Sequence, residues 1–160
     1  MIDTDFELLD ISLYTEEPDR RVVPLRGLDA PDTPEIPEGA VVSVGLTFRL
    51  GREIVGLAFE DSRVHEGLVL ATVRTVLGGF RAGGPYEVRL QPERLSVGRV
   101  HRGVYELTGR FTDGDGRELA VAHHRIRVVP QPAAYKRRAV TAAPGPAQRL
   151  SGAPGGSLAW

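Results

Sequence analysis

Residues 102–116 read Arg-Gly-Val-Tyr-Glu-Leu-Thr-Gly-Arg-Phe-Thr-Asp-Gly-Asp-Gly, and this stretch decides the predicted fold. Its side chains alternate, so that Tyr105, Leu107 and Phe111 fall on one face and Glu106 and Arg110 on the other. A period of two is typical of a half-buried antiparallel strand. The acidic, glycine-rich end predicts a tight turn, because glycine readily adopts the positive φ angles that hairpin turns need. We therefore predict a hairpin that continues as a second strand.

The rest of the body repeats this pattern in short segments between turns. Pro24 lies inside one segment and predicts that it forms a sheet edge, where a missing amide is tolerated. The proline-rich residues 30–39 are expected to form an irregular loop. The predicted strands are 6–15, 21–26, 40–50, 53–61, 68–77, 86–90, 103–112 and 117–129. About eight short strands without a convincing helix predict an all-β fold, an immunoglobulin-like antiparallel β-sandwich over residues 1–129.

Residues 130–160 differ in composition from this body. They are dominated by Ala, Pro, Gly and Ser and cannot bury enough apolar surface to offset the entropy of ordering them, so we predict a disordered tail. Lys136, Arg137 and Arg138 form its charged cluster. This cluster is interpreted as a solvated basic spot, with docking to a protein partner as the alternative.

The overall composition excludes several classes of function. The chain of 160 residues has a net charge of −1 and no cysteine, which argues against nucleic-acid binding, disulfides and thiol chemistry. No apolar run approaches the roughly 18 residues that a membrane-spanning helix needs, and residues 1–5 lack the apolar core of a secretory signal. We expect a cytoplasmic protein without membrane insertion.

Catalytic and metal-binding patterns are weak. His123 and His124 are adjacent on a predicted strand, so they point to opposite faces and cannot share a metal. The turn at 113–116 lacks the remaining ligands of a calcium loop, and the glycine pairs at 78–79 and 83–84 lack the Gly-Lys-Ser/Thr of a phosphate loop. We predict no catalytic residue, no metal site, no cofactor and no enzymatic activity. The apolar interior is either a plain core or a cavity between the sheets, and periodicity does not separate these.

Several ordered stretches of the body are similar to one known family. Residues 48–55, Phe-Arg-Leu-Gly-Arg-Glu-Ile-Val, are similar to Phe-Arg-Val-Asn-Arg-Glu-Ile-Val of the Rho GDP-dissociation inhibitors. Gly-Gly-Phe at 78–80 sits where that family has Gly-Ser-Tyr, and Gln-Pro-Glu at 91–93 resembles its Thr-Pro-x-Glu. Residues 102–113 carry its Arg-Gly-x-Tyr and Arg-Phe-Thr-Asp at the same spacing. The resemblance runs from about residue 6 to residue 129.

This resemblance implies a domain that holds the prenyl group of Rho-type GTPases between its two sheets. It has two departures in the body: Ala122 and His124 stand where the family has Trp-x-Trp, and Glu93 is followed by Arg94 where the family has acidic pairs. Loss of two indoles either enlarges the cavity or lets other side chains fill it. The residues expected to line the lipid cavity are Leu46, Phe48, Leu57, Phe59, Leu77, Phe80, Tyr105, Leu107, Ala122 and His124.

Two functions follow as hypotheses. In the first, a non-catalytic module binds an isoprenoid or other lipid chain and solubilises or shuttles a lipid or a lipidated partner, which includes a small GTPase. Because almost nothing precedes the first predicted strand, inhibition of nucleotide release through an N-terminal arm is not expected. In the second, a protein-interaction or assembly module has kept the sandwich and lost the lipid pocket.

Overall fold

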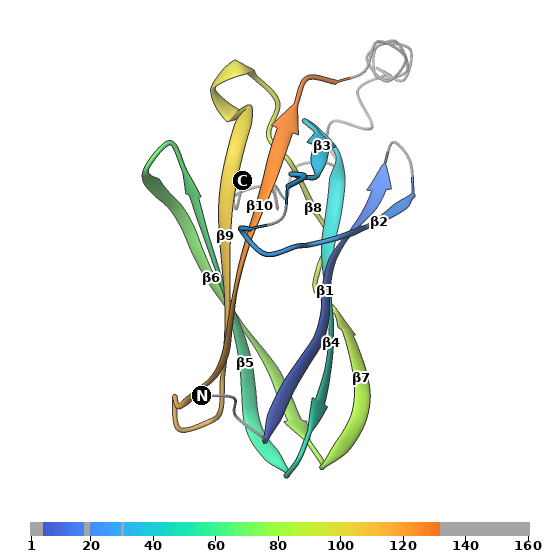
Figure 1. The fold of residues 1–160 in the computed structure, drawn as a ribbon, viewed down its shortest axis with the longest axis vertical. Coiled ribbons are helices and arrows are strands. Elements are labelled where there is room, and N and C mark those ends of the chain that lie inside the picture. Colours follow the sequence, from blue (N-terminus) through green and yellow to red (C-terminus); the bar gives the residue numbers. More distant parts are fainter. Residues whose placement is uncertain (1–4, 18–19, 30, 132–160) are drawn as a thin grey trace, which may run out of the picture.

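Two β-sheets packed face to face form the protein in a computed structural model, which describes residues 5–17, 20–29 and 31–131. Figure 1 shows the two layers, with β5, β6, β9 and β10 in one and β1, β2, β4 and β7 in the other. One sheet has the order β2 (Arg21–Pro24), β1 (Phe6–Glu17), β4 (Val41–Leu50), β7 (Gly83–Arg89), with β8 (Glu93–Arg94) also paired to β4. The other has the order β3 (Glu35–Pro37), β10 (Glu118–Val129), β9 (Gly103–Thr112), β5 (Ile54–His65), β6 (Leu68–Phe80).

All strand pairs are antiparallel except β3 with β10, which is parallel. The predicted all-β, immunoglobulin-like antiparallel β-sandwich is therefore confirmed. The tail predicted for residues 130–160 lies almost entirely outside the described residues, and the domain boundary near residue 130 stays a prediction. Within the described part of the chain, no helix is long and apolar enough to cross a membrane.

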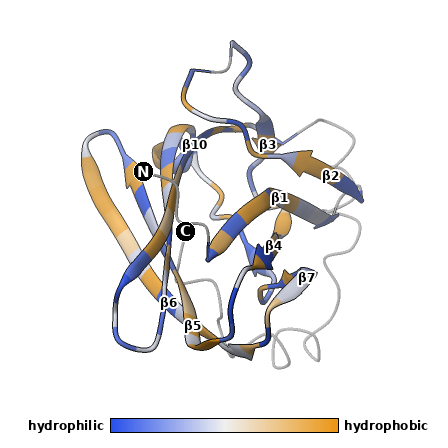
Figure 2. Cartoon of the chain, turned by 60° about the horizontal axis from the view of Figure 1, so that its bottom comes forward, coloured by the Kyte–Doolittle hydropathy of each residue, from blue (hydrophilic) through white to orange (hydrophobic). Residues whose placement is uncertain are grey.

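Side-chain alternation builds the interior as expected. On β9, Tyr105, Leu107, Gly109 and Phe111 are buried between the sheets, while the residues between them are more exposed. The same alternation of polar and apolar residues is visible along β1 in Figure 2. Gly109 is required here because a β-carbon at this position would lie 2.7 Å from the ring of Phe59. The absent side chain lets that ring pack directly against β9.

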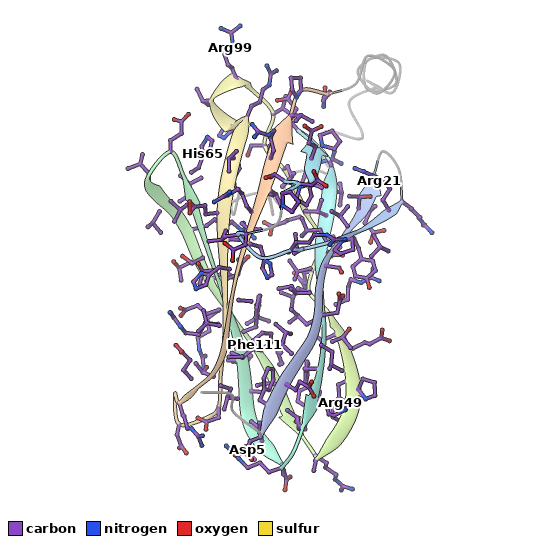
Figure 3. The ribbon with its side chains drawn as sticks, in the orientation of Figure 1. Asp5, Arg21, Arg49, His65, Arg99 and Phe111 are labelled. Carbon is purple, nitrogen blue, oxygen red and sulfur yellow. The ribbon has the colours of Figure 1, made fainter. Side chains whose placement is uncertain are left out.

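An aromatic cluster fills the interior around Phe111. Phe111 packs against Phe6 and Phe59 at ring-centroid distances of 4.8 and 4.9 Å, and Phe48 meets Phe80 edge to face at 5.2 Å. Figure 3 shows Phe111 between the two layers. Offset and edge-to-face contacts of this kind add to the stabilisation that apolar burial provides. The interior around these rings is a packed core.

The structure corrects the loop that was expected over residues 30–39. Its last part forms β3, which pairs with β10, and the amide of Arg127 donates a hydrogen bond to the Pro34 carbonyl at 2.8 Å. Proline is compatible with this strand because β3 lies at a sheet edge. The edge position of β2, predicted from Pro24, is confirmed. Two short elements were not predicted: β8, and a single 3₁₀ turn at Arg99–His101.

Candidate functional site

A groove opens between the two sheets, on the side where β5 and β6 face β4 and the segment that leads into β8. Its volume is about 380 Å³. We call it the inter-sheet groove, and its lining residues are Val44, Asp61, Arg63, Val73, Thr75, Leu90, Gln91, Pro92 and Glu93. Small-molecule sites usually have volumes of roughly 300–1,000 Å³, so the groove is large enough to hold a small apolar group.

Strand register sets the walls of the inter-sheet groove. Val73 and Thr75 pair with Asp61 and Phe59 of β5, so all four side chains point to the inner face of their sheet. On the opposite wall, the amide of Leu90 donates to the Val44 carbonyl at 2.8 Å, which holds the chain beyond β7 against β4. The walls are therefore largely apolar and come from both sheets.

A charged triad lies at the base of the groove. The Arg63 guanidinium contacts Asp61 at 2.9 Å and Glu93 at 2.6 Å. Arg63 is 3% exposed, and the two carboxylates are 15% and 18% exposed. Asp61 and Arg63 belong to β5 of one sheet and Glu93 to β8 of the other, so the triad joins the two layers. With two carboxylates to one guanidinium, the base of the groove carries net negative charge.

Burial also alters the protonation of this triad. The pKa of Asp61 is raised above its usual value, chiefly because burial removes water from the carboxylate. The charge and hydrogen bond of Arg63 work against this rise, and the charge of Glu93 adds to it. Asp61 therefore takes up a proton at a higher pH than an exposed aspartate does.

The expected lipid-lining residues lie in the sandwich interior, and none of them lines the inter-sheet groove. Phe48, Phe59 and Phe80 belong to the aromatic cluster, and Leu46, Leu57 and Leu107 are buried in the same apolar core, with Leu77 packed partly buried against it. Tyr105 stacks on His65 at 4.2 Å, and its hydroxyl donates to the His101 carbonyl at 2.7 Å. Their role in lipid binding stays a prediction.

Ala122 and His124 lie on β10, beside the segment that follows β2. His124 is 6% exposed and its Nδ1 donates to the Arg26 carbonyl at 3.1 Å. The amide of Leu25 donates to the Ile11 carbonyl, so this segment closes the sandwich next to His124. Burial lowers the pKa of His124, which keeps its imidazole neutral at pH 7. Its neighbour His123 points outward, as predicted, and contacts Thr108.

Sequence reasoning missed Asp61, Arg63 and Val73 as site residues. A signal was present: the inward-facing series that includes Leu57 and Phe59 continues in steps of two to Asp61 and Arg63. Charged residues on the inner face of a strand are expected only when they are paired or line a cavity. The partner of Arg63 was not evident, because Glu93 lies 30 positions further along the chain.

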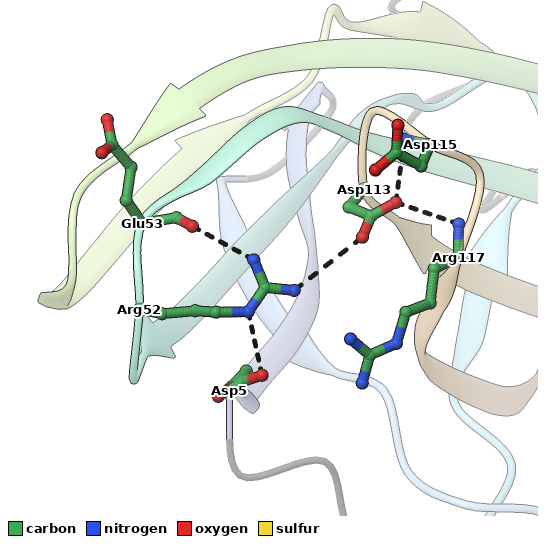
Figure 4. Close-up of polar contacts among 6 residues, drawn as sticks. All are labelled: Asp5, Arg52, Glu53, Asp113, Asp115 and Arg117. Atoms are coloured by element: carbon green, nitrogen blue, oxygen red, sulfur yellow. Dashed lines mark hydrogen bonds and ion pairs between the residues drawn. The ribbon is translucent and has the colours of Figure 1, made fainter.

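The expected acidic turn was placed correctly. Asp113 Oδ1 accepts hydrogen bonds from the amides of Asp115 and Arg117 at 2.9 and 3.0 Å, and its other oxygen lies 3.8 Å from Arg52 (Figure 4). Arg52 also donates to Asp5, so the turn is tied to the start of β1. The carboxylate thus has a structural role. Among the residues that the structure describes, no group of three or more potential metal ligands is close enough to hold an ion.

Comparison with known proteins identifies the class to which this sandwich belongs. The model of the family described as "RHO protein GDP dissociation inhibitor" matches residues 2–129. The chain belongs to this family.

Among curated proteins, the Rho GDP-dissociation inhibitor of Schizosaccharomyces pombe is 31% identical over 93 residues. The match covers 57% of this chain and 43% of that protein, so the chain matches less than half of the length of this relative. A solved structure of a Niemann-Pick type C2 protein from Japanese carpenter ant superposes with a TM-score of 0.49 at 9% identity, covering 78% of this chain and 93% of that one.

Proposed function

We propose that this protein is a non-catalytic module that binds an isoprenoid or similar lipid chain and so solubilises or shuttles a lipidated partner, such as a small GTPase, in the cytoplasm. The observation that supports it most directly is the inter-sheet groove, which lies within the part of the chain that matches the family. Its apolar walls suit a hydrocarbon chain. Each Å² of apolar surface that such a chain removes from water is worth about 25 cal/mol.

The chemistry of the groove favours a particular kind of lipid carrier. Val44, Val73, Leu90 and Pro92 offer apolar contacts, whereas Asp61 and Glu93 leave an excess of negative charge beside them. A lipid attached to a protein segment with basic residues would satisfy both features. A free fatty acid would place its carboxylate next to like charges, which is unfavourable.

A lipid chain longer than the inter-sheet groove would have to extend past the residues that line it. The inner-face rows run from Thr75 to Leu77 and from Val44 to Leu46, so the expected lining residues are the next ones along the same strands. Leu77 is only partly buried, so its side chain is less constrained by packing than those of the fully buried residues Leu46 and Phe59. We propose that the lipid chain enters at the inter-sheet groove and displaces Leu77 as it reaches toward Phe59.

A substitution that fills the inter-sheet groove with a large side chain tests this proposal. Thr75→Trp places an indole inside the groove, and Thr72→Trp places the same side chain on the opposite face of the same strand, β6. Binding is measured by the fluorescence of a dansyl-labelled farnesyl-cysteine methyl ester. We expect Thr75→Trp to weaken binding at least about tenfold, or about 1.4 kcal/mol, and the control to leave it unchanged.

The packed aromatic cluster favours the second candidate function, an interaction module without a lipid pocket. In that case the unmodified protein shows no saturable fluorescence change with the farnesyl probe, although circular dichroism reports a folded sandwich. A partner captured by pull-down would then bind either the sandwich surface or residues 130–160. Removal of residues 130–160 would show which of these two regions binds it. Saturable binding that both tryptophan variants weaken equally would also argue against the inter-sheet groove as the site.

A further inference from the structure

We propose that β6 is a self-association edge, through which two copies of this chain join their sheets into one continuous sheet. β6 is the terminal strand of the β3-β10-β9-β5-β6 sheet, and Figure 1 shows it at the left margin of the molecule. The backbone groups on the outer side of a terminal strand have no strand partner, and such edges pair readily with another strand.

The four sheet edges in the described part of the chain differ sharply in composition. β2 ends in Pro24, β3 ends in Pro37, and β7 contains Pro85 and is continued by the charged pair of β8. Proline and charge are the usual devices that block pairing at an edge. β6 has no proline, and Arg74 is the single charged residue among its 13 residues.

The side chains of β6 also remain uncovered. The structure exposes 43–67% of five large apolar residues on this strand, which are Leu68, Val69, Leu70, Val73 and Val76. They occupy both faces of the strand, because Val73 shares the inner face with Asp61 whereas Val76 points outward. A monomer would leave this apolar strip in water, and a paired strand would cover much of it.

The sequence of β6 fits a second copy of itself. A two-fold axis perpendicular to the sheet at Val73 pairs each residue with one on the same face of the second copy. Within the regular stretch 71–76 of β6, Val73 then meets Val73, Arg74 meets Thr72 and Thr75 meets Ala71 of the second copy; the register shift beside Leu70 ends this stretch. This register puts the two copies of Val73 together and no two like charges directly opposite, an arrangement that stabilises cross-strand pairs. A partner of different sequence would need to supply such a match, whereas a second copy already carries it.

Cysteine scanning tests this register directly, because the chain has no native cysteine. Val73→Cys places the thiol on the two-fold axis, opposite its own copy, so mild oxidation should give a covalent dimer in high yield. Val76→Cys lies on the same edge, but in this register it is about 20 Å from its own copy, as six residues of strand separate them. It should therefore stay monomeric on denaturing gels, whereas the double variant Thr72→Cys/Arg74→Cys, within the regular stretch of β6, should cross-link.

A charge variant provides the equilibrium measurement. Sedimentation equilibrium of the full chain, from micromolar to millimolar concentration, should show a monomer–dimer equilibrium. Val76→Lys, at an outward-facing position, should weaken it at least about tenfold, and Val55→Lys, an equally exposed site on β5, should not. A chain that remains monomeric throughout, or equal cross-linking of the Val73 and Val76 single variants, overturns the proposal.

Association of two copies through β6 does not depend on lipid binding. Val73 also lines the inter-sheet groove, so the lysine test uses Val76, which faces away from it. The monomeric Val76→Lys variant should still bind the farnesyl probe if the proposed function holds. Loss of probe binding in the unmodified protein, with the dimer intact, would refute the proposed function alone.

Discussion

Glu38 carries a charge into the interior of the protein and is held there by dedicated partners. It is 1% exposed, and its carboxylate accepts hydrogen bonds from Arg102 at 2.8 and 2.9 Å and from the Gly98 amide at 3.0 Å. These bonds, the one from Arg102 above all, lower its pKa from 4.5 to about 2 against the opposing effect of burial. A single side chain thereby fixes the loop between β8 and β9 to the end of β3.

The low pKa of Glu38 predicts a pH-dependent contribution to stability. Because the folded-state pKa is depressed, the contribution is complete above about pH 4.5 and is lost as the pH falls toward 2. Glu38→Gln should lower the free energy of unfolding at pH 7 by roughly 1.5–3 kcal/mol. Urea denaturation should show that the difference in free energy of unfolding between the variant and the unmodified protein becomes smaller as the pH falls from 4.5 to 2. A difference that stays constant over this range would contradict the prediction. Glu106→Gln, at an exposed position, is the control.

At the scale of elements, the β9–β10 hairpin depends on its turn as well as on its strands. The amide of Asp113 donates to the Arg117 carbonyl and the Gly116 amide donates to the Asp113 carbonyl, both at 3.0 Å. Gly116 has a φ of 83°, a left-handed conformation that glycine adopts without strain. The Asp113 carboxylate completes the turn by binding two further amides. Local chemistry therefore sets the register between β9 and β10.

Removal of this carboxylate should destabilise the hairpin. Asp113→Ala leaves the amides of Asp115 and Arg117 without their acceptor and should cost roughly 1–3 kcal/mol in thermal or urea unfolding. Asp113→Asn keeps one oxygen acceptor and should cost less. Asp115→Ala, at an exposed position of the same turn, is the matched control. If Asn and Ala at position 113 cost the same, the amide bonds are not the source of the stability.

At the scale of the whole molecule, the two sheets are held together by two kinds of contact. The aromatic cluster around Phe111 joins them through apolar packing, whereas the groove side is joined by the Arg63 bridge to Glu93. Figure 3 shows Phe111 between the two layers and His65 nearer the end of the molecule that carries Arg99. A cavity can exist on the groove side because a charged bridge, unlike interdigitated rings, leaves space beside it.

Arg63 should therefore be critical for the integrity of the groove side. Arg63→Met leaves Asp61 and Glu93 without their shared cation and should lower the free energy of unfolding by roughly 3–5 kcal/mol. The triple variant Asp61→Asn/Arg63→Met/Glu93→Gln removes the unpaired charges and should recover much of this loss. Hydrogen exchange should show faster opening of β5 and β8 in the single variant. Equal loss in the single and triple variants would show that Arg63 acts through packing rather than charge.

Much of the fold could be predicted because strand formation is encoded locally. The inward positions of Tyr105, Leu107 and Phe111 follow from alternation alone, and β9 has the bounds expected for it. The short strand β3 could not be predicted in this way, because it exists only through pairing with β10, which is far away in sequence. The local signal of its prolines was outweighed by that pairing.

The candidate site was much less predictable than the fold. Family resemblance indicated a lipid-holding sandwich, and it directed attention to the buried rows of Leu46, Phe59 and Leu107. The inter-sheet groove lies beside those rows. The contacts of its lining residues could not be predicted from the sequence. Its shape depends on residues of both sheets, including Arg63 and Glu93, which lie 30 residues apart in the sequence.

Sequence patterns were enough to predict most of the strands, the hairpin turn at Asp113 and the family, because alternation, turn chemistry and ordered motifs are properties of neighbouring residues. The short strands β3 and β8 were not among them. Only the tertiary structure decided where the interior is closed and where it is open. The physical reason is that ring packing around Phe111 and the ion bridge at Arg63 both join residues of opposite sheets. Such contacts form only once the two sheets have met, and no local pattern specifies them.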